Sequence, residues 1–322
     1  MTTLVNTMTA KVRRETERSL AIAAAALVIF LVVGPFILYP VFIMKALCFA
    51  LFACAFNLLL GYVGLLSFGH ALYFGWAGYL AAHAAKVWGL QPEFALLVGT
   101  ATGMVLGLIA GVVAIRRQGI YFAMITLALA QMMYLVAVRA PMTGGEDGIQ
   151  SVPQGRLFGV FDLSNQMTMY AFVVVVALAA FFLIYRIINS PFGEVLKAIR
   201  ENEQRAISLG YKTDNYKLVA FALSATLAGL AGSLKALVFQ LASLTDVHWT
   251  MSGEVVLMTL VGGLGTIFGP IVGAFLIVAM ENYLAPFGQW VLVIQGAVFV
   301  ICVLAFRRGI VGELAARLRV RL

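Results

Sequence analysis

The sequence predicts an all-α, polytopic membrane protein of about eight transmembrane helices, with glycine-broken or re-entrant half-helices in addition. Of its 322 residues, 62% are hydrophobic and only 11% are charged, whereas soluble domains carry about 25% charged residues. Apolar runs such as 21–44 and 120–138 reach the length of roughly 20 residues at which a helix crosses a bilayer. One transmembrane domain is expected over residues 20–306, between polar tails at 1–19 and 307–322.

Six apolar segments precede a polar island at residues 189–217. Two prolines end the first segment, and a glycine-rich break from Gly61 to His70 separates the second from the third. A loop that contains Thr143-Gly144-Gly145 separates the fifth from the sixth. The expected bounds of the six are 20–38, 41–60, a third that ends near 85, 94–115, 119–138 and 168–188.

Two stripes of small residues predict close helix packing. Glycines recur at four-residue intervals in the fourth segment, and small residues recur at similar spacing in the apolar run 216–241. Small residues on one helix face let a neighbouring backbone approach closely. The two stripes are Gly99, Gly103, Gly107 and Gly111 in the first case, and Ala225, Ala228, Gly229 and Gly232 in the second.

Residues 254–282 are expected to form a broken hairpin. The run 254–261 is half a span long and meets a glycine-rich stretch that includes Gly262, Gly263 and Gly265. Non-helical backbone is tolerated inside a membrane only where protein covers it or where it lines a cavity. The hairpin is therefore predicted to dip to mid-membrane and return, before a last span at 290–306. The breaks at 64–69 and 262–269 are alike, which raises the expectation of an internal repeat.

The net charge of +8 fits loops retained in the cytoplasm better than a nucleic-acid surface. Lys and Arg concentrate in the two tails, at Arg116 and Arg117, and in the polar island, so the positive-inside rule places both termini in the cytoplasm. The rule is satisfied only if 254–282 is a hairpin. Lys45 is expected to snorkel to the interface; Lys235, Glu254 and Glu281 are expected near the outer interface.

The polar island predicts a helix that lies on the membrane surface. Ser190 is a good N-cap, Pro191 then occupies the first helical position, and Gly210 suits the left-handed conformation that ends a helix. Apolar residues line one face and charged residues the other. The apolar set is Leu196, Ile199, Ala206 and Ile207, and Lys197/Glu201 and Glu201/Arg205 are expected i,i+4 pairs. An ordinary solvated loop is the alternative.

Several sequence motifs that mark nucleotide-binding, catalytic or metal sites are absent. The chain has no Walker A pattern, no nucleophile elbow and no Cys/His metal spacing. Cys48, Cys54 and Cys302 all lie in apolar runs and are expected to be buried small hydrophobic residues. No cofactor and no nucleic acid is therefore expected to bind this chain.

The motifs resemble those of branched-chain amino acid ABC importer permeases, of the LivM type. The resemblance covers residues from about 41 to 312. It is carried by the island sequence from Ala198 to Gly210, the following run Lys217–Phe221, Asn57–Gly61, Gly64–Ala71, Thr143–Gly145, Gly262–Thr266 and Arg308–Gly312.

The resemblance implies that the island is the coupling helix, which docks on a cytoplasmic ATPase. The implied docking residues are Arg200, Glu201, Asn202, Arg205, Ala206 and Gly210. It further implies a LivH-type permease partner, two ATPase subunits, a periplasmic solute-binding protein and a bacterial inner membrane whose lipid surrounds the spans. Leucine, isoleucine and valine are the default solutes, with urea and short amides as alternatives.

Several intramembrane polar residues and glycines are candidates for the translocation pathway. Ionisable and polar groups at depth tend to face cavities, although a lone intramembrane histidine such as His70 is more often a hydrogen-bonded structural residue. The candidates are Asn57, Ser67, His70, Thr143, Gly144, Gly145, Gly262, Gly263 and Gly265. An ion-coupled carrier is the competing class, which the scarcity of acids in the spans disfavours, and a membrane-embedded enzyme is a weaker third.

Overall fold

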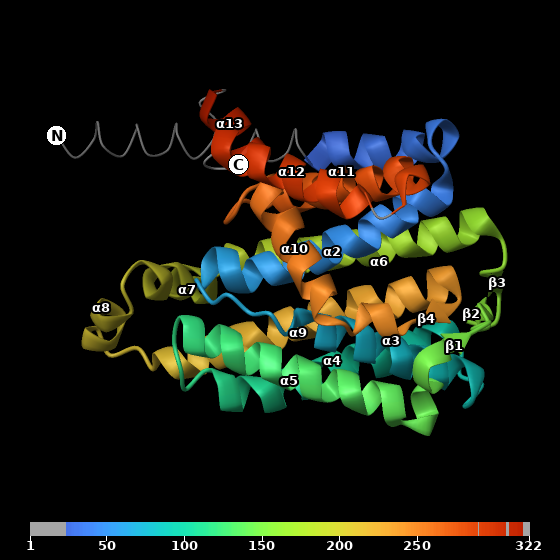
Figure 1. The fold of residues 1–322 in the computed structure, drawn as a ribbon, viewed down its shortest axis with the longest axis horizontal. Coiled ribbons are helices and arrows are strands. Elements are labelled where there is room, and N and C mark those ends of the chain that lie inside the picture. The colour runs from blue at the N-terminus through green and yellow to red at the C-terminus, as the bar shows by residue number, and fades with distance from the viewer. Residues whose placement is uncertain (1–23, 289, 307–308, 318–322) are drawn as a thin grey trace.

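The computed structural model describes residues 24–288, 290–306 and 309–317. Its long helices lie side by side along the longest axis of the molecule, as Figure 1 shows. The short helices α7 (Pro191–Glu201) and α8 (Glu203–Ser208) mark one end of the bundle, and the strands β1 (Ile149–Gln150), β2 (Arg156–Leu157) and β3 (Phe161–Asp162) mark the other. These are called the α7 end and the β end below.

Six helices are long and apolar enough to cross a membrane, so the chain is a multi-pass membrane protein. Five of them match predicted spans, but the count of about eight is not supported. The sixth, α11, is the second arm of the hairpin predicted over 254–282. The six are α2 (Pro40–Tyr62), α4 (Pro92–Ala114), α5 (Ile120–Arg139), α6 (Gln166–Ile188), α9 (Thr213–Phe239) and α11 (Gly269–Leu284), which continues to Phe287 through η4 (Ala285–Phe287).

The remaining helices are shorter. The first, Ala24–Ile37, begins where the described chain begins, so the start of the span predicted at 20–38 lies outside the described residues. The N-terminal tail predicted at 1–19 lies wholly outside them, whereas 309–317 of the predicted C-terminal tail are described and form a helix. The shorter labelled helices are α3 (His70–Lys86), α10 (Trp249–Gly262), α12 (Trp290–Ala305) and α13 (Gly309–Arg317).

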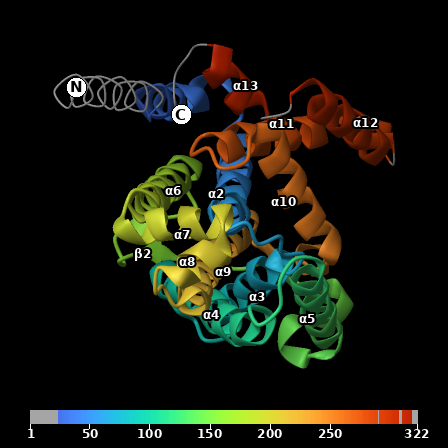
Figure 2. The ribbon, with the colours of Figure 1, turned by 90° about the vertical axis from the view of Figure 1, so that its left-hand side faces the viewer.

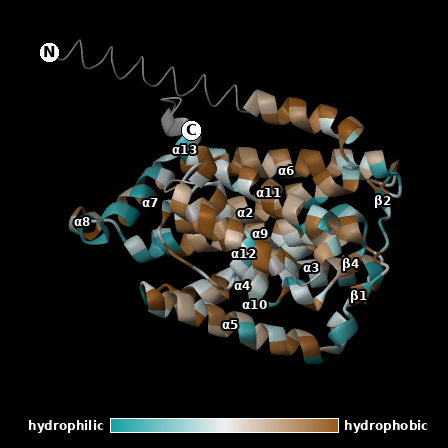
Figure 3. Ribbon diagram, turned by 45° about the horizontal axis from the view of Figure 1, so that its top comes forward, coloured by the Kyte–Doolittle hydropathy of each residue, from teal (hydrophilic) through white to brown (hydrophobic). Residues whose placement is uncertain are grey.

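Helix α2 forms the centre of the molecule. Nearly all of its residues from Ile43 to Tyr62 are buried, and α9, α6, α10 and α11 pack around it (Figure 2). Helices α5 and α6 instead present hydrophobic residues outwards along their length, while α7, α8 and the β2 region are hydrophilic (Figure 3). This distribution fits a bundle whose sides face lipid and whose two ends face water.

The two predicted stripes of small residues pack against each other. A Cβ added at Gly103 would meet the carbonyl oxygen of Ala225 at 2.7 Å and the Cα of Gly229 at 3.0 Å. Gly107 faces the Cβ of Ala225 in the same way. Helices α4 and α9 therefore approach each other so closely that backbone contacts backbone, as glycine stripes allow.

The all-α prediction needs a small correction at the β end. The segment between α5 and α6 contains two short 3-10 helices and three two-residue strands, and a fourth strand follows α9. These are η1 (Pro141–Thr143), η2 (Gly145–Asp147), β1 (Ile149–Gln150), β2 (Arg156–Leu157), β3 (Phe161–Asp162) and β4 (Leu241–Ala242). Antiparallel pairing of β1 with β4 ties this segment to the end of α9, and β2 pairs with β3.

The prediction that the 254–282 hairpin stops at mid-membrane is wrong. Its tip, residues 263–268, reaches the α7 end, where Gly265 lies beside Gly61 in the last turn of α2 and beside Arg200 at the end of α7. Helix α11 then returns toward the β end, so the two arms still form the antiparallel hairpin that the charge distribution required. The internal repeat stays a prediction.

The prediction of one continuous surface helix is also wrong. The island forms α7 (Pro191–Glu201) and α8 (Glu203–Ser208), separated at Asn202, whose backbone is extended (φ −158°, ψ 98°). Asn202 caps α8 by accepting a hydrogen bond from the Arg205 N–H at 3.0 Å. Because Asn is a strong N-cap, it favours the start of a second helix at this position. Ser190 caps α7 as predicted, and Gly210 has a positive φ of 89°.

Candidate functional site

The two predicted glycine breaks meet at the α7 end. Asn57 of α2 donates a hydrogen bond from Nδ2 to the Thr266 carbonyl at 2.9 Å. Its Oδ1 accepts from the Gly265 N–H at 3.0 Å. One buried amide therefore holds the tip of the α10–α11 hairpin against the last turns of α2. We call Asn57, Gly61, Gly64, Arg200 and Gly265 the glycine junction.

Arg200 connects this junction to the surface helices. Its guanidinium donates a hydrogen bond to the Gly61 carbonyl and lies beside Gly265, while the Cβ and Cγ of its side chain pack beside Gly64. Because Arg200 lies in the last turn of α7, a movement of that helix acts directly on both glycine breaks.

The junction requires glycine for steric and conformational reasons. A Cβ on Gly61 would overlap Asn57 Oδ1 and lie 2.9 Å from the Gly265 nitrogen. Gly64 and Gly265 have φ values of 83° and 72°, in the left-handed region that other residues rarely occupy. Any side chain at these positions would separate the two breaks.

The other glycines of the second break bring α10 and α11 together. A Cβ on Gly262 would overlap the Gly269 carbonyl, and Gly263 has a φ of 129°. Gly309, at the start of α13, also packs on Gly263, with its added Cβ within 2.6 Å of the Gly263 nitrogen. The C-terminal helix therefore begins at the same end of the molecule as the glycine junction.

Glu203, at the start of α8, joins three elements. Its carboxylate pairs with Lys217 of α9, whose side chain is only 2% exposed, and accepts from Thr213 Oγ1 at 3.1 Å. Its second oxygen accepts from Gln118 Nε2 in the α4–α5 turn at 2.9 Å. The carboxylate thus fixes α8 to the ends of α9 and α4. Lys197, in contrast, pairs with Glu194 at 2.8 Å instead of the predicted Glu201.

The exposed surface of α7 and α8 differs from the predicted docking set in one residue. Arg200, Glu201, Asn202, Arg205 and Gly210 are exposed, but Ala206 is buried. The turn at Asn202 rotates α8, so Ile207, predicted to face inwards, is exposed instead. Leu209 is 70% exposed, and Tyr211 is also exposed. The surface is therefore mixed, with charged residues beside three apolar ones.

A small cavity of about 240 Å³ lies between these helices and the glycine break of α2. Its walls include Gly64, Gln118, Arg200, Glu203 and Lys217. Arg200, Glu203 and Lys217, which link α7 and α8 to the rest of the molecule, therefore line an empty space. Their side chains have room to rearrange.

His70 and Ser67 lie deeper in the bundle. His70 is fully buried and its Nε2 lies 2.9 Å from Ser224 Oγ, which itself donates to the Ala55 carbonyl. The Ser224 proton is thus committed to Ala55, so His70 Nε2 is the donor. Ser67 Oγ accepts from the Gly69 N–H at 3.2 Å. Both residues shape the chain that leads from the first glycine break into α3.

Thr143, Gly144 and Gly145 lie at the β end, far from the glycine junction. Thr143 is buried and donates to the carbonyl oxygens of Ala137 and Ala140, at 2.6 and 2.7 Å. Gly144 and Gly145 follow with φ values of 76° and 64°. This segment ends α5 and turns the chain toward β1, so the structure does not bring it together with the other candidate residues.

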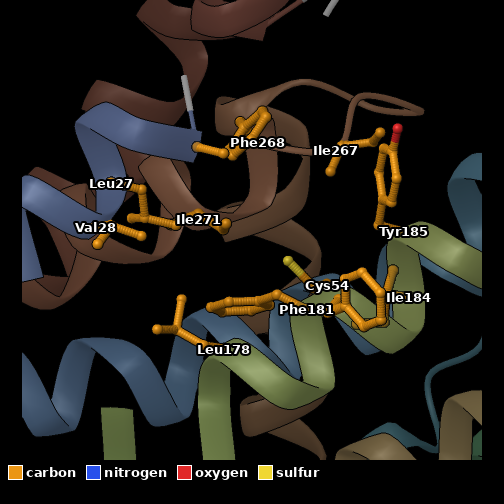
Figure 4. A pocket seen from close by; sticks show the side chains of 12 residues that line it. Leu27, Val28, Cys54, Leu178, Phe181, Ile184, Tyr185, Ile267, Phe268 and Ile271 are labelled. Atoms are coloured by element: carbon orange, nitrogen blue, oxygen red, sulfur yellow. The ribbon is translucent and has the colours of Figure 1, made fainter. Parts of the chain in front are cut away.

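An apolar pocket of about 370 Å³ opens between the helix Ala24–Ile37, α2, α6 and α11. In Figure 4, side chains such as Leu27, Phe181, Cys54 and Ile271 converge on it from these four helices. Its lining is almost entirely hydrophobic, with the Tyr185 ring at one side. Among the described residues, no group of His, Cys, Asp and Glu is placed to hold a metal ion.

Sequence reasoning missed Glu203, Lys217 and Leu209. Lys217 was recognisable as a charge inside an apolar stretch, but its partner lies 14 residues away across the start of α9. Leu209 is exposed because α7 ends at Asn202 and α8 begins there in a new direction. In the sequence, the only indication of this break is the preference of Asn for N-cap positions.

The sequence of the chain is similar to those of known transport proteins. The family model described as branched-chain amino acid transport system / permease component matches residues 39–303. The chain is 25% identical over 288 residues to the high-affinity branched-chain amino acid transport system permease protein LivM of Escherichia coli, covering 82% of this chain and 68% of that protein. A probable LivH permease of Methanocaldococcus jannaschii is 26% identical over 246 residues, 70% of this chain and 75% of that protein.

A third relative transports a different solute by name. The autoinducer 2 import system permease protein LsrC of Yersinia pseudotuberculosis is 28% identical over 198 residues, 59% of this chain and 53% of that protein. No solved structure matches. Since the family model covers most of the chain, including both glycine breaks and the polar island, this protein belongs to the branched-chain amino acid transport system permease family.

Proposed function

We propose that the chain is a permease subunit of a binding-protein-dependent ABC importer in a bacterial inner membrane. It would move leucine, isoleucine, valine or related small solutes inwards, driven by ATP hydrolysis on partner subunits. The complex would contain a LivH-type permease, two ATPase subunits with ATP and Mg²⁺, and a periplasmic solute-binding protein. Relatives named as branched-chain amino acid permeases support this assignment.

The observation that carries the proposal is the placement of α7 and α8. They present an exposed mixed surface, and Arg200 and Glu203 connect that surface to the glycine junction and to α9. A docked ATPase that moved these helices would act on the breaks in both hairpins at once. In this role Arg200, Glu201, Asn202, Arg205 and Gly210 contact the ATPase, together with Ile207 and Leu209.

The α7 end then faces the cytoplasm. Arg205 lies in α8 and Lys212 directly before α9, while Arg116 and Arg117 adjoin Gln118, which bonds Glu203 of α8. All four are therefore at this end, as the positive-inside rule requires. The β end, with Thr143, Gly144 and Gly145, faces the periplasm and is available to the binding protein. In this orientation the glycine junction, which includes Asn57 and Gly265, forms the inner gate together with the neighbouring Gly262 and Gly263. Ser67 and His70 support the first glycine break on the side of the gate away from the cytoplasm.

Solute identity is the less specific part of the proposal. The family includes a permease named for autoinducer 2 import, and urea or short amides fit the same motifs. An ion-coupled carrier that works without ATPases is the competing class.

Uptake of radiolabelled leucine into proteoliposomes tests the proposal. The vesicles contain this chain, its permease partner and the ATPases, with binding protein outside and ATP inside. Uptake that requires both ATP and binding protein is the expected result. Uptake that persists without ATP and follows an ion gradient would contradict it in favour of a carrier. If only leucine uptake fails, labelled urea and amides are the next solutes.

A further inference from the structure

The apolar pocket beside α2 is enclosed on several sides. Its walls come from the helix Ala24–Ile37, α2, α6, α11 and the hairpin tip, and side chains such as Val28, Leu178 and Ile271 converge on it in Figure 4. Its volume of about 370 Å³ falls within the range of small-molecule sites. The pocket can therefore hold a ligand, which a flat lipid-facing surface cannot do.

The chemistry of the walls selects a hydrocarbon ligand. Among the described residues that line the pocket none is charged, and Tyr185 supplies the only side-chain hydroxyl. A polar solute would lose its hydrogen bonds to water here without replacement, and an apolar cavity does not hold water. The neighbouring Phe182 is 66% exposed on α6, a membrane-spanning helix, so the pocket borders the lipid phase. A lipid acyl chain is the apolar group at hand there.

Arg186 adds a positive charge at the α7 end of the pocket. It follows Tyr185 and lies four residues after Phe182, so it is one turn further along the same face of α6. Its side chain is exposed and forms no ion pair with any other described residue. Basic side chains at the ends of membrane-spanning helices attract anionic head groups. An apolar pocket with a free guanidinium one turn beyond it is complementary to an anionic lipid.

The far wall of the pocket is the hairpin tip. Ile267 and Phe268 line the pocket and directly follow Thr266, whose carbonyl accepts the hydrogen bond from Asn57. Cys54, also in the lining, lies one turn before Asn57 on α2. A chain seated in the pocket therefore packs against the contact that holds the tip to α2.

From the enclosed apolar walls and the adjacent free guanidinium, we propose that this pocket binds one acyl chain of an anionic phospholipid. The chain enters from the leaflet at the α7 end, and Arg186 binds the phosphate-bearing head group. The apolar walls select the chain, and the guanidinium favours a net negative head group over a zwitterionic one. This site is additional to the proposed transport function and does not depend on which solute is moved.

Photoaffinity labelling tests the site. The full chain, with the subunits that copurify with it, is placed in phosphatidylcholine nanodiscs that contain a small fraction of phosphatidylglycerol with a diazirine in one acyl chain. After irradiation, peptide mapping should find the label concentrated on 24–28, 178–185 and 267–271, compared with the exposed residues of α5. Excess unlabelled phosphatidylglycerol should remove that label. Even labelling of all lipid-facing helices, labelling that the competitor leaves unchanged, or no label in the pocket because a protein segment fills it, would overturn the proposal.

Val28→Trp tests the pocket itself. Val28 is 43% exposed, so the larger ring can enter the pocket without displacing core side chains, and labelling of 178–185 should fall about 5-fold or more. Ile29→Trp is the matched control, because Ile29 is 62% exposed on the same helix and does not line the pocket. Equal labelling of 178–185 in the two variants would contradict occupation of this pocket.

Arg186→Gln tests the head-group contact. Labelling of the pocket by the phosphatidylglycerol probe should fall about 2- to 5-fold, the range of one partly exposed charge pair, while labelling by the matching phosphatidylcholine probe should stay the same. Arg117→Gln, which removes an exposed arginine at the same end of the molecule, should change neither. Equal labelling by the two probes in the wild type, or an unchanged preference in Arg186→Gln, would overturn the anionic lipid site.

Discussion

Asn57 Oδ1 accepts a hydrogen bond from the Gly265 N–H at 3.0 Å, across 208 residues of sequence. The same side chain donates to the Thr266 carbonyl at 2.9 Å. A single amide on α2 thereby fixes the tip of the α10–α11 hairpin. The contact joins the two glycine breaks, which the sequence separates widely.

Asn57→Leu tests this contact. The substitution keeps the side-chain volume and leaves one N–H and one carbonyl of the hairpin tip without partners, so we expect the free energy of unfolding to fall by about 2–4 kcal/mol. Denaturant titration in detergent measures the change. Asn189→Leu is the control, since exposed Asn189 bonds only the local Tyr185 carbonyl and should change stability by less than about 1 kcal/mol. Equal effects of the two substitutions would show that the Asn57 contact is not special.

The glycine breaks and the stripes of small residues could be predicted from the sequence because glycine placement is a local signal. Each stripe predicted a close neighbour, but that the stripe of α4 packs against the stripe of α9 was not predicted. How deep the second break lies could not be predicted, because it depends on Asn57, Gly61 and Arg200, which lie far away in sequence. The apolar run 254–261 is short, and a short run that ends in glycines suggests a hairpin whose tip lies at mid-membrane. Only the distant contacts of the tip show otherwise.

The ion pairs Lys45–Glu281 and Lys235–Asp246 were missed for a related reason. Lys45, Lys235 and Glu281 each appeared as an isolated charge near the end of an apolar run, where placement at the membrane interface is the simplest explanation. Their pairing depends on how α2, α9 and α11 pack, which hydropathy does not encode. In α7 and α8 one residue, Asn202, redirects the apolar face, so that Ala206 is buried and Ile207 is exposed.

Glu203→Gln should destabilise the protein strongly. The substitution leaves Lys217, only 2% exposed, charged and unpaired, which typically costs about 3–5 kcal/mol. Adding Lys217→Met should recover most of that loss, because the double variant has no unpaired charge. Thermal unfolding in detergent measures both.

Glu194→Gln is the matched control for this pair. Glu194 pairs with Lys197 on the exposed side of α7, where such pairs contribute less than about 1 kcal/mol. A loss as large as that of Glu203→Gln, or a double variant no more stable than the single one, would contradict the anchoring role of Glu203.

Substitutions on the exposed face of α8 should remove ATPase binding without unfolding the chain. Arg205→Glu and Leu209→Asp alter exposed side chains, so the free energy of unfolding should change by only about 0.5 kcal/mol. Copurification of the ATPase subunits should fall sharply in both. Arg156→Glu reverses a charge at the β end and should retain them. Retained ATPases in both α8 variants would contradict the docking assignment.

Arg200 should give a different result from Arg205, because it links the docking surface to the glycine junction. Arg200→Met removes the hydrogen bond to the Gly61 carbonyl while Arg205 and Leu209 remain available for docking. We expect ATPase copurification and ATP hydrolysis to persist, and leucine uptake per ATP hydrolysed to fall about 10-fold or more, the usual worth of one charged hydrogen bond. Arg200→Lys should recover part of the loss, since an ammonium group can reach the same carbonyl without the planar guanidinium contact to Gly265. Parallel loss of docking and uptake would make Arg200 an ordinary docking residue, and unchanged uptake would show that α7 does not act through the junction.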